Sequence, residues 1–182
     1  MVSNTAPQNR ISTLDEMVRL LKNGDYNPVL SQAEHTTLSL DDVLPYLHFN
    51  KGRYTRNCIA RDDYFELVLL CWEQGQKTAI HCHNNQECWV KVVAGSFAEE
   101  LYRINNTSGE MEYISTEMLS QHDVTAVEDA NIFHNLTNKS RGRSISLHLY
   151  MKPIEECRIY DEETSQIKRV SLSYDTLEGK PC

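Results

Sequence analysis

Residues 75–95 have the sequence GQKTAIHCHNNQECWVKVVAG, with two histidines in the first half and an apolar run in the second. On a strand, His81 and His83 would project from the same face because they are two residues apart. The β-branched residues after Cys88 are typical of a second strand, so the pattern predicts a hairpin with a metal-binding pair at its mouth. Gly75 and Gly95 flank this segment. The sequence therefore predicts strands arranged around a metal site.

Composition narrows the class of protein. The 182 residues suit one domain with a sizeable core. The 18 basic and 26 acidic residues give a formal net charge of −8, and without a basic block we expect no nucleic-acid partner. No membrane-length apolar run or leader pattern occurs, so we expect no membrane association and a cytoplasmic, monomeric protein. The six cysteines form no CxxC pair, which favours reduced thiols.

Two short helices are predicted at the start of the chain. Thr13 and Glu16 form a capping-box pattern ahead of apolar residues at helical spacing. Ser39 and Asp42 start a second helix, which Pro45 should shorten. We expect the apolar stripe of the first helix to pack on the outside of the main domain.

Short strands follow from residue 51 onward. We place them near 53–59, 64–72, 76–82, 88–95, 97–104, 110–117, 123–127, 131–137, 143–151, 156–161 and 166–174. Such a density of short strands after two helices indicates an antiparallel β-barrel or jelly roll. We therefore predict a mainly β protein with a helical segment at residues 1–50 and a β-barrel at residues 51–182, as a single domain overall.

The segment at residues 75–95 resembles the first motif of the cupin barrels. A metal ion needs at least three ligands, so a third histidine should come from another strand. The remaining histidines are His35, His48, His122, His134 and His148. His134 is favoured because Asn131 and Asn138 flank it much as a glycine and an asparagine flank the histidine of the second cupin motif. The predicted ligands are His81, His83 and His134.

Cupins commonly place a glutamate ligand four or five residues after the second histidine, where this chain has Glu87 or Cys88. The spacing to Gly95 favours Cys88, and alternation puts Cys88 on the same inward face as Val90. A cysteine therefore occupies the expected carboxylate position. Three neutral histidines without an anionic protein ligand suit a substrate that supplies its own negative charge, such as a thiolate.

Two further groups of polar residues lie on predicted strands. In the segment SLHLY, alternation places Ser146, His148 and Tyr150 on one face. That face either lines a site, with His148 orienting the Tyr150 hydroxyl and Ser146 behind it, or points to water while the leucines fill the core. Tyr54 and Arg56 also share a face. An arginine directed into a cavity would bind a carboxylate, although exposed arginines are far commoner.

Together these motifs resemble those of the cysteine dioxygenase family. The matching segments are RYTRN (53–57), CW (71–72), IHCH (80–83) with Cys88, and SLHLY (146–150). The match extends in order from about Arg53 to Tyr174, and its motifs are specific in combination. The resemblance implies a cupin barrel that binds Fe(II) through His81, His83 and His134.

The resemblance also implies an activity in cysteine catabolism. L-Cysteine would bind the iron through its thiolate and amine, with its carboxylate on Arg56 and Tyr54, and O₂ would oxidise the sulfur to cysteine sulfinic acid. Members of the family can form a thioether crosslink between the residues that correspond to Cys88 and Tyr150, and His148 would hold Tyr150 by a hydrogen bond. Tyr150, Cys88 and His148 would then be the catalytic residues.

The chain also departs from the family pattern. Cys82 lies between the first two ligands, where an acidic residue is common, and Cys157 resembles a cysteine near the site entrance to which we assign no chemistry. After Tyr150 the family often has Ser-Pro-Pro with a cis peptide, whereas this chain has Met151-Lys152-Pro153. We expect a trans bond before Lys152, because cis peptides are costly unless proline follows.

Other functions compete with this interpretation. The enzyme rivals are a dioxygenase of another small thiol, such as 3-mercaptopropionate or cysteamine, and a sugar-phosphate isomerase. Arg56 argues against cysteamine, which has no carboxylate, and only weakly against 3-mercaptopropionate. The isomerase would normally use a glutamate at the position of Cys88. A non-catalytic metal-binding cupin would bind metal without consuming O₂.

Overall fold

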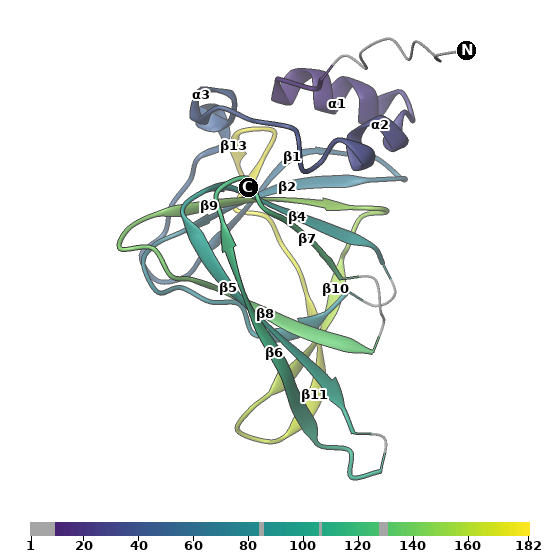
Figure 1. Cartoon of the computed structure of the whole chain (residues 1–182), viewed down its shortest axis with the longest axis vertical. Helices are drawn as coiled ribbons and strands as arrows, with labels where there is room; N and C mark the ends of the chain where they lie inside the picture. Colours follow the sequence, from purple (N-terminus) through teal and green to yellow (C-terminus); the bar gives the residue numbers. More distant parts are fainter. Residues whose placement is uncertain (1–9, 84–85, 106, 128–130) are drawn as a thin grey trace, which may run out of the picture.

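The computed structural model describes residues 10–83, 86–105, 107–127 and 131–182 (Figure 1). Its helices are α1 (Leu14–Lys22), α2 (Tyr26–Ser31), α3 (Leu40–Val43) and the 3-10 helix η1 (Leu44–Tyr46). Its strands are β1 (Thr55–Arg61), β2 (Glu66–Trp72), β3 (Ile80–Cys82), β4 (Cys88–Ala94), β5 (Ser96–Ile104), β6 (Met111–Ser120), β7 (Val124–Val127), β8 (Ile132–Asn138), β9 (Ser144–Tyr150), β10 (Glu156–Asp161), β11 (Gln166–Ser171), β12 (Thr176–Leu177) and β13 (Lys180–Pro181).

The strands form two sheets. The first has the order β13-β12-β1-β2-β9-β4-β7, and the second has the order β11-β10-β3-β8-β5-β6. All neighbouring strands pair antiparallel except β1 and β12, which run parallel. The helices cover the outer side of the first sheet (Figure 1). The predicted mainly β class with short N-terminal helices is confirmed.

The helix starts follow from their caps. The Thr13 side chain accepts a hydrogen bond from the Glu16 amide at the start of α1. Ser39 and Asp42 form a reciprocal capping box at the start of α3, and Pro45 lies in the η1 turn that ends it. Both predicted starts are therefore correct. Helix α2 was not predicted; it has only six residues, and Asp25 at its start makes no side-chain capping bond.

Strands β2 and β9 are buried on both faces. Their odd-numbered apolar residues pack under the helices, including Leu67, Leu69, Leu147 and Leu149 against Leu14 and Met17. Their even-numbered residues face the space between the sheets, where Val68 and Leu70 pack near Tyr150. Because both faces are covered, the alternative in which the polar face of SLHLY points to water is wrong.

The predicted hairpin within residues 75–95 is also wrong. Strand β3 pairs with β8 and β10 in the second sheet, whereas β4 pairs with β7 and β9 in the first. The segment crosses from one sheet to the other instead of folding back on itself. His81 therefore belongs to the second sheet and Cys88 to the first.

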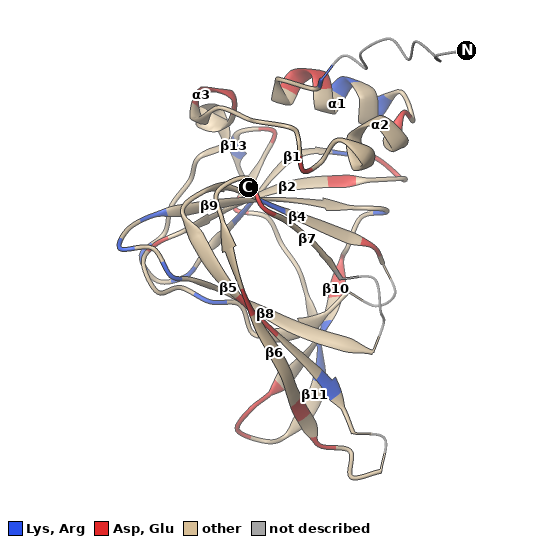
Figure 2. Ribbon diagram, in the orientation of Figure 1, with Lys and Arg blue, Asp and Glu red and all other residues tan. Residues whose placement is uncertain are grey.

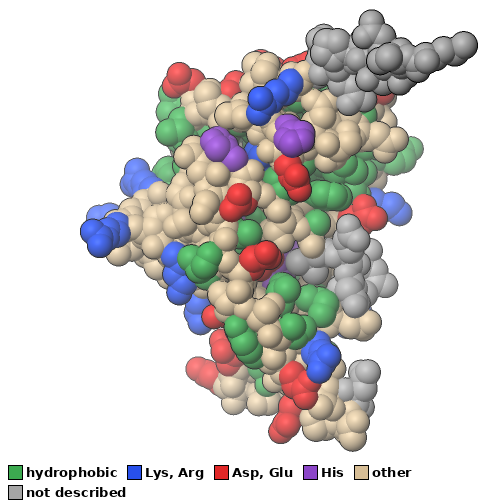
Figure 3. Space-filling view, in the orientation of Figure 1, with side chains coloured by type: hydrophobic (Ala, Val, Ile, Leu, Met, Phe, Trp, Pro, Cys, Tyr) green, Lys and Arg blue, Asp and Glu red, His purple; other side chains and the backbone are tan. Residues whose placement is uncertain are grey.

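Charged residues lie mostly in the helices, the loops and the second sheet, and the ribbon of the first sheet is largely uncharged (Figure 2). On the face shown in Figure 3, acidic and basic side chains are interspersed. Across the described residues, no helix is both long and apolar enough to cross a membrane. All six cysteines are free, and only Cys182 is exposed.

Candidate metal centre

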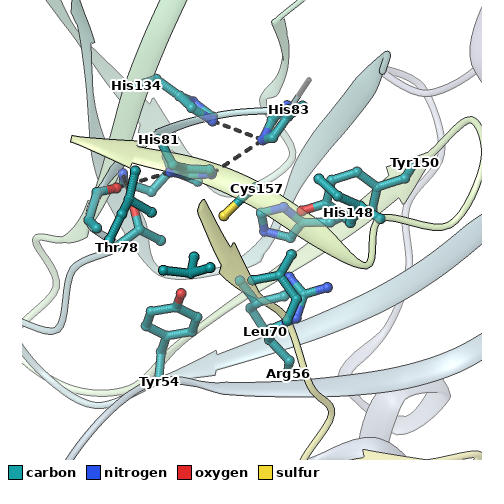
Figure 4. A pocket seen from close by; sticks show the side chains of 16 residues that line it. Tyr54, Arg56, Leu70, Thr78, His81, His83, His134, His148, Tyr150 and Cys157 are labelled. Atoms are coloured by element: carbon teal, nitrogen blue, oxygen red, sulfur yellow. Dashed lines mark hydrogen bonds between the residues drawn. The ribbon is translucent and has the colours of Figure 1, made fainter. Parts of the chain in front are cut away.

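Three histidines meet at one side of a cavity between the sheets (Figure 4). His81 on β3 and His134 on β8 are direct partners across the two strands, and His83 follows β3 on the same face as His81. The Nε2 atom of His83 lies 3.3 Å from that of His81 and 3.2 Å from that of His134. The ligand atoms of all three lie within 4.8 Å of one another. This cluster could hold a metal ion.

Hydrogen bonds fix which ring nitrogens face inward. His81 donates from Nδ1 to the Ala79 carbonyl at 3.0 Å. His134 donates from Nδ1 to the Glu99 carboxylate at 2.6 Å. A neutral imidazole that donates from Nδ1 has a lone pair on Nε2. Converging lone pairs repel one another unless a cation or a proton lies between them, so the donor set fits a metal ion.

Burial keeps His81 and His83 in the neutral form that binds metals. It lowers the pKa of His81 to about 3, with a further contribution from His134. Burial also holds the pKa of His83 and of His148 well below the ordinary value. A metal ion therefore displaces no proton from His81 or His83 at neutral pH.

Cys88 and Tyr150 lie side by side on neighbouring strands of the first sheet. They are direct partners in the β4–β9 pairing, and both are buried. Burial, followed by the neighbouring Cys88, raises the pKa of Tyr150 well above its ordinary value, while Arg56 opposes the shift. The pKa of Cys88 is also raised, chiefly by burial. Both groups are thus protonated at neutral pH, and their side chains interact.

His148 makes a different contact from the one expected. Its Nε2 lies 2.8 Å from the Ser146 hydroxyl, which also accepts a hydrogen bond from Trp72 Nε1 at 3.0 Å. The rings of His148 and Tyr150 stack with centroids 6.3 Å apart. Among the described residues, no hydrogen bond joins His148 to the Tyr150 hydroxyl. Ser146 thus fixes His148, and His148 packs on Tyr150.

Arg56 and Tyr54 line the cavity across from the histidines (Figure 4). The Tyr54 ring stacks on Trp72 with centroids 4.7 Å apart. Arg56 is only 8% exposed, and its Nη2 lies 3.1 Å from the Glu66 carboxylate. Burial opposes its charge, but Tyr150 and Glu66 keep the pKa of Arg56 above its ordinary value. A permanent cation therefore lines the cavity.

The cavity has a volume of about 190 Å³. Apolar side chains form much of its wall, among them Leu70, Leu136, Ile154, Ile159, Val170 and Leu172. The Cys157 thiol also lines it, and burial raises the pKa of that thiol to about 11. Cys82 packs against Ile80 and Phe133, away from the histidines, as alternation predicts. The described peptide bonds are trans, including the one before Lys152.

The family model described as cysteine dioxygenase type I matches residues 2–163. The chain belongs to this family. Cysteine dioxygenase type 1 of Homo sapiens is 31% identical over 137 residues, which cover 74% of this chain and 68% of the human protein. The Danio rerio protein of the same description is 28% identical over 143 residues, covering 76% and 71% of the two chains.

The chain is also similar, at low identity, to solved structures of other proteins. An uncharacterized conserved protein with a double-stranded beta-helix domain from Klebsiella pneumoniae is 15% identical, covers 71% of this chain and 95% of its own, and has a TM-score of 0.49. KdgF from Halomonas sp. is 18% identical, covers 58% and 84%, and has a TM-score of 0.47.

Two buried carboxylates beside the cavity were not predicted from the sequence. Glu99 binds His134, and its other oxygen accepts a hydrogen bond from the Thr125 hydroxyl at 2.7 Å. Glu66 binds Arg56 and is fully buried. In both cases the sequence signal was an acidic residue on a strand whose neighbours two positions away, which share its face, are apolar.

Proposed function

We propose that this chain is a thiol dioxygenase that oxidises L-cysteine with O₂ to cysteine sulfinic acid, using Fe(II) bound by His81, His83 and His134. The main support is that three converging imidazoles and a buried arginine line the same 190 Å³ cavity. Three imidazoles suit several divalent transition metals, and membership of the cysteine dioxygenase family favours iron among them. Iron bound there would supply the one-electron chemistry that a thiol and O₂ need to react.

The residues of the chain would bind and orient the substrate. Arg56 would bind the substrate carboxylate, because its guanidinium is charged, buried and open to the cavity. The Tyr54 hydroxyl lies on the same side (Figure 4) and would take the second position around that carboxylate. The thiol would then point toward the three histidines. Ile159 and Val170 at the wall would limit access of water to the reacting sulfur.

Cys88 and Tyr150 would form the thioether crosslink known from the family. Their direct pairing across β4 and β9 supports this proposal, since side chains of paired residues project from the same face. The crosslink would fix the Tyr150 hydroxyl beside the cavity, with His148 stacked on its ring. Mass spectrometry after turnover should detect a peptide pair lighter by two hydrogen atoms, and Cys88→Ser should abolish it while leaving residual activity.

The test of the function is O₂ consumption by the Fe(II)-loaded protein with L-cysteine, 3-mercaptopropionate and cysteamine in parallel. We expect uptake with L-cysteine above the other two. Uptake with 3-mercaptopropionate alone would retain the chemistry and change the substrate. No uptake with any of the three, from protein with iron bound, would contradict the proposal and favour a non-catalytic metal-binding cupin.

Arg56→Ala tests the substrate assignment within the same assay. We expect the KM for L-cysteine to rise by about tenfold or more, because a hydrogen bond to a charged group contributes about 1.5–3 kcal/mol. Any turnover of cysteamine should change little, since cysteamine has no carboxylate. Equal effects on the two thiols would mean that Arg56 does not bind the carboxylate.

A further inference from the structure

Beside the cavity lies a buried ion pair that the metal cluster does not explain. Arg56 Nη2 and Glu66 Oε1 are 3.1 Å apart, and the two side chains are 10% and 0% exposed. Burying either charge alone would cost several kcal/mol, so each requires the other. Glu66 does not line the cavity, whereas Arg56 does. The pair therefore extends from the wall of the cavity into the protein.

Glu66 is held in place on the side away from Arg56. Its second oxygen accepts a hydrogen bond from the Ile154 amide at 2.9 Å. Tyr174 is also a neighbour of this carboxylate. Burial raises the pKa of the Tyr174 hydroxyl, and Glu66 raises it further. Arg61 donates to the same hydroxyl at 3.1 Å. The carboxylate thus has a fixed position set by backbone and side-chain contacts.

The position of Glu66 in the sheet relates it to the proposed catalytic residues. Glu66 is the direct partner of Tyr150 on β9, and Tyr150 is the direct partner of Cys88 on β4. One row across three strands therefore contains the carboxylate, the tyrosine and the cysteine. Side chains of such a row lie on the same face of a sheet. A shift of Arg56 away from Glu66 would move its charge relative to Tyr150 as well.

The guanidinium still has an unused donor. Arg56 Nε is buried and has no hydrogen-bond partner among the described residues. A buried donor without a partner is costly, and a ligand acceptor in the cavity would remove that cost. Glu66 engages Nη2 and Tyr150 also bonds to the guanidinium, so the N–H groups that these two do not use, Nε among them, are the ones available to a ligand.

We propose that Glu66 is a positioning residue: it holds the Arg56 guanidinium at the cavity wall, so that its remaining N–H groups face a substrate carboxylate, and it thereby sets the preference for carboxylate-bearing thiols. This inference rests on the proposed function, in which Arg56 binds that carboxylate. A side chain already fixed in its bound position loses little entropy when the ligand arrives, so the arrangement favours affinity as well as selectivity.

The test is anaerobic binding of L-cysteine and of cysteamine to the Fe(II)-loaded protein, with and without Glu66→Gln. Glutamine has nearly the same shape, but its amide N–H₂ would face either Arg56 Nη2 or the Ile154 amide, which are both donors. We expect the affinity for L-cysteine to fall by about tenfold or more and that for cysteamine to remain unchanged. A similar loss for both thiols would overturn the proposal, because it indicates a purely structural role. A gain in L-cysteine affinity would also overturn it, because Glu66 would then compete for Arg56.

Three further variants complete the experiment. Glu155→Gln removes an exposed carboxylate that pairs with Arg61, and it should leave both affinities unchanged. Glu66→Asp retains the charge and should restore part of the L-cysteine affinity, which also covers the case in which the glutamine variant fails to fold. In an Arg56→Met background, Glu66→Gln should cause no further loss of L-cysteine affinity. An additive loss in that background would contradict positioning through Arg56.

A second measurement separates this proposal from the proposed function. If wild-type protein with iron bound does not bind L-cysteine, the proposed function fails. The Arg56 Nε–H signal in a ¹H–¹⁵N spectrum then tests the positioning alone, with Arg56→Lys providing its assignment. Glu66→Gln should shift or broaden that signal, and an unchanged signal would overturn the proposal.

Discussion

Glu99 determines which nitrogen of His134 faces the candidate metal site. The Nδ1–Oε1 distance is 2.6 Å, and both side chains are only 1% exposed. The Thr125 hydroxyl binds the other carboxylate oxygen, which prevents rotation of the group. A carboxylate behind a metal-binding histidine both orients the ring and makes it a stronger ligand.

Glu99→Gln should therefore lower Fe(II) affinity by about 10–100-fold, because the amide retains one acceptor but removes the charge. The measurement is anaerobic competition with a chelating dye. Glu100→Gln is the matched control, since Glu100 lies next along β5 and binds Asn135 and Tyr102 away from the metal site. Affinity equal to that of the wild type in Glu99→Gln would show that Glu99 does not act on the metal site.

At this scale, local pattern predicted the three histidines and Arg56 but not the carboxylates that bind His134 and Arg56. The spacing of His81 and His83 on one strand, together with the residues around His134, was enough to predict that these histidines meet. Glu99 and Glu66 depend on contacts between residues 35 and 10 positions apart, and alone each resembles an ordinary surface acid. Alternation places each of them on the same face of its strand as apolar residues, which is the sequence signal that they point inward.

The turn from β4 into β5 is tightly constrained at Gly95. Gly95 has φ +87, and a Cβ there would lie 2.0 Å from Ser144 Oγ. Ser144 cannot move away freely, because its hydroxyl donates to Asn138 Oδ1 at 2.7 Å. The glycine that flanks the first motif is therefore required both by backbone conformation and by space.

Gly95→Ala should lower the free energy of unfolding by about 1–3 kcal/mol more than Gly109→Ala does. Gly109 also has positive φ, at +76, but a Cβ added there would meet no atom within 4 Å. The comparison thus isolates the steric clash from the backbone strain that both substitutions share. Urea unfolding of the two variants measures the difference, and equal losses would contradict the packing argument.

Element boundaries were predicted where a local signal sets them. Thr13 and Ser39 mark helix starts through their own capping bonds. The partner of β3 could not be predicted in this way, because β3 has only three residues and pairs with β8 and β10, far along the chain. The apparent hairpin failed for that reason: adjacent strands in sequence need not pair when each finds a better partner elsewhere.

For the whole molecule, Asp175 joins the C-terminal segment to β1. Its carboxylate accepts hydrogen bonds from the Arg53 guanidinium and from the Arg56 amide, at 2.6–2.9 Å. Strand β12 then pairs parallel with β1. Burial alone would raise the pKa of Asp175, but the bonds from Arg53 and Arg56 outweigh it and lower that pKa below 3.8. The ionised form therefore stabilises the folded state.

Asp175→Asn should cost about 1–3 kcal/mol at pH 7, because the amide meets donors that the carboxylate satisfied. Since the folded-state pKa is lowered, the contribution is complete above the unfolded value of 3.8 and disappears as the pH falls through the folded value. Urea unfolding at pH 7 and pH 3 should therefore show a smaller penalty at pH 3. Asp63→Asn, at an exposed position, is the control. A penalty independent of pH would contradict the electrostatic explanation.

The two-sheet architecture was largely predictable from the succession of short strands after two helices. Strands β12 and β13 were not predicted, because each has only two residues and neither shows an alternating pattern. The polar face of β9 could not be assigned from the sequence, since β9 is covered on both sides and its leucines face the helices. The sequence of a strand does not reveal whether a segment from elsewhere in the chain covers its outer face.

The fate of ¹⁸O₂ in a reaction of Fe(II)-loaded protein with L-cysteine is the most direct test of the proposed dioxygenase activity. We predict cysteine sulfinic acid labelled at both sulfur-bound oxygens, and no such product from His134→Ala, in which one of the three converging ligands is lost. Product with one label or none, or unreacted L-cysteine in the presence of iron-bound wild-type protein, would contradict that activity.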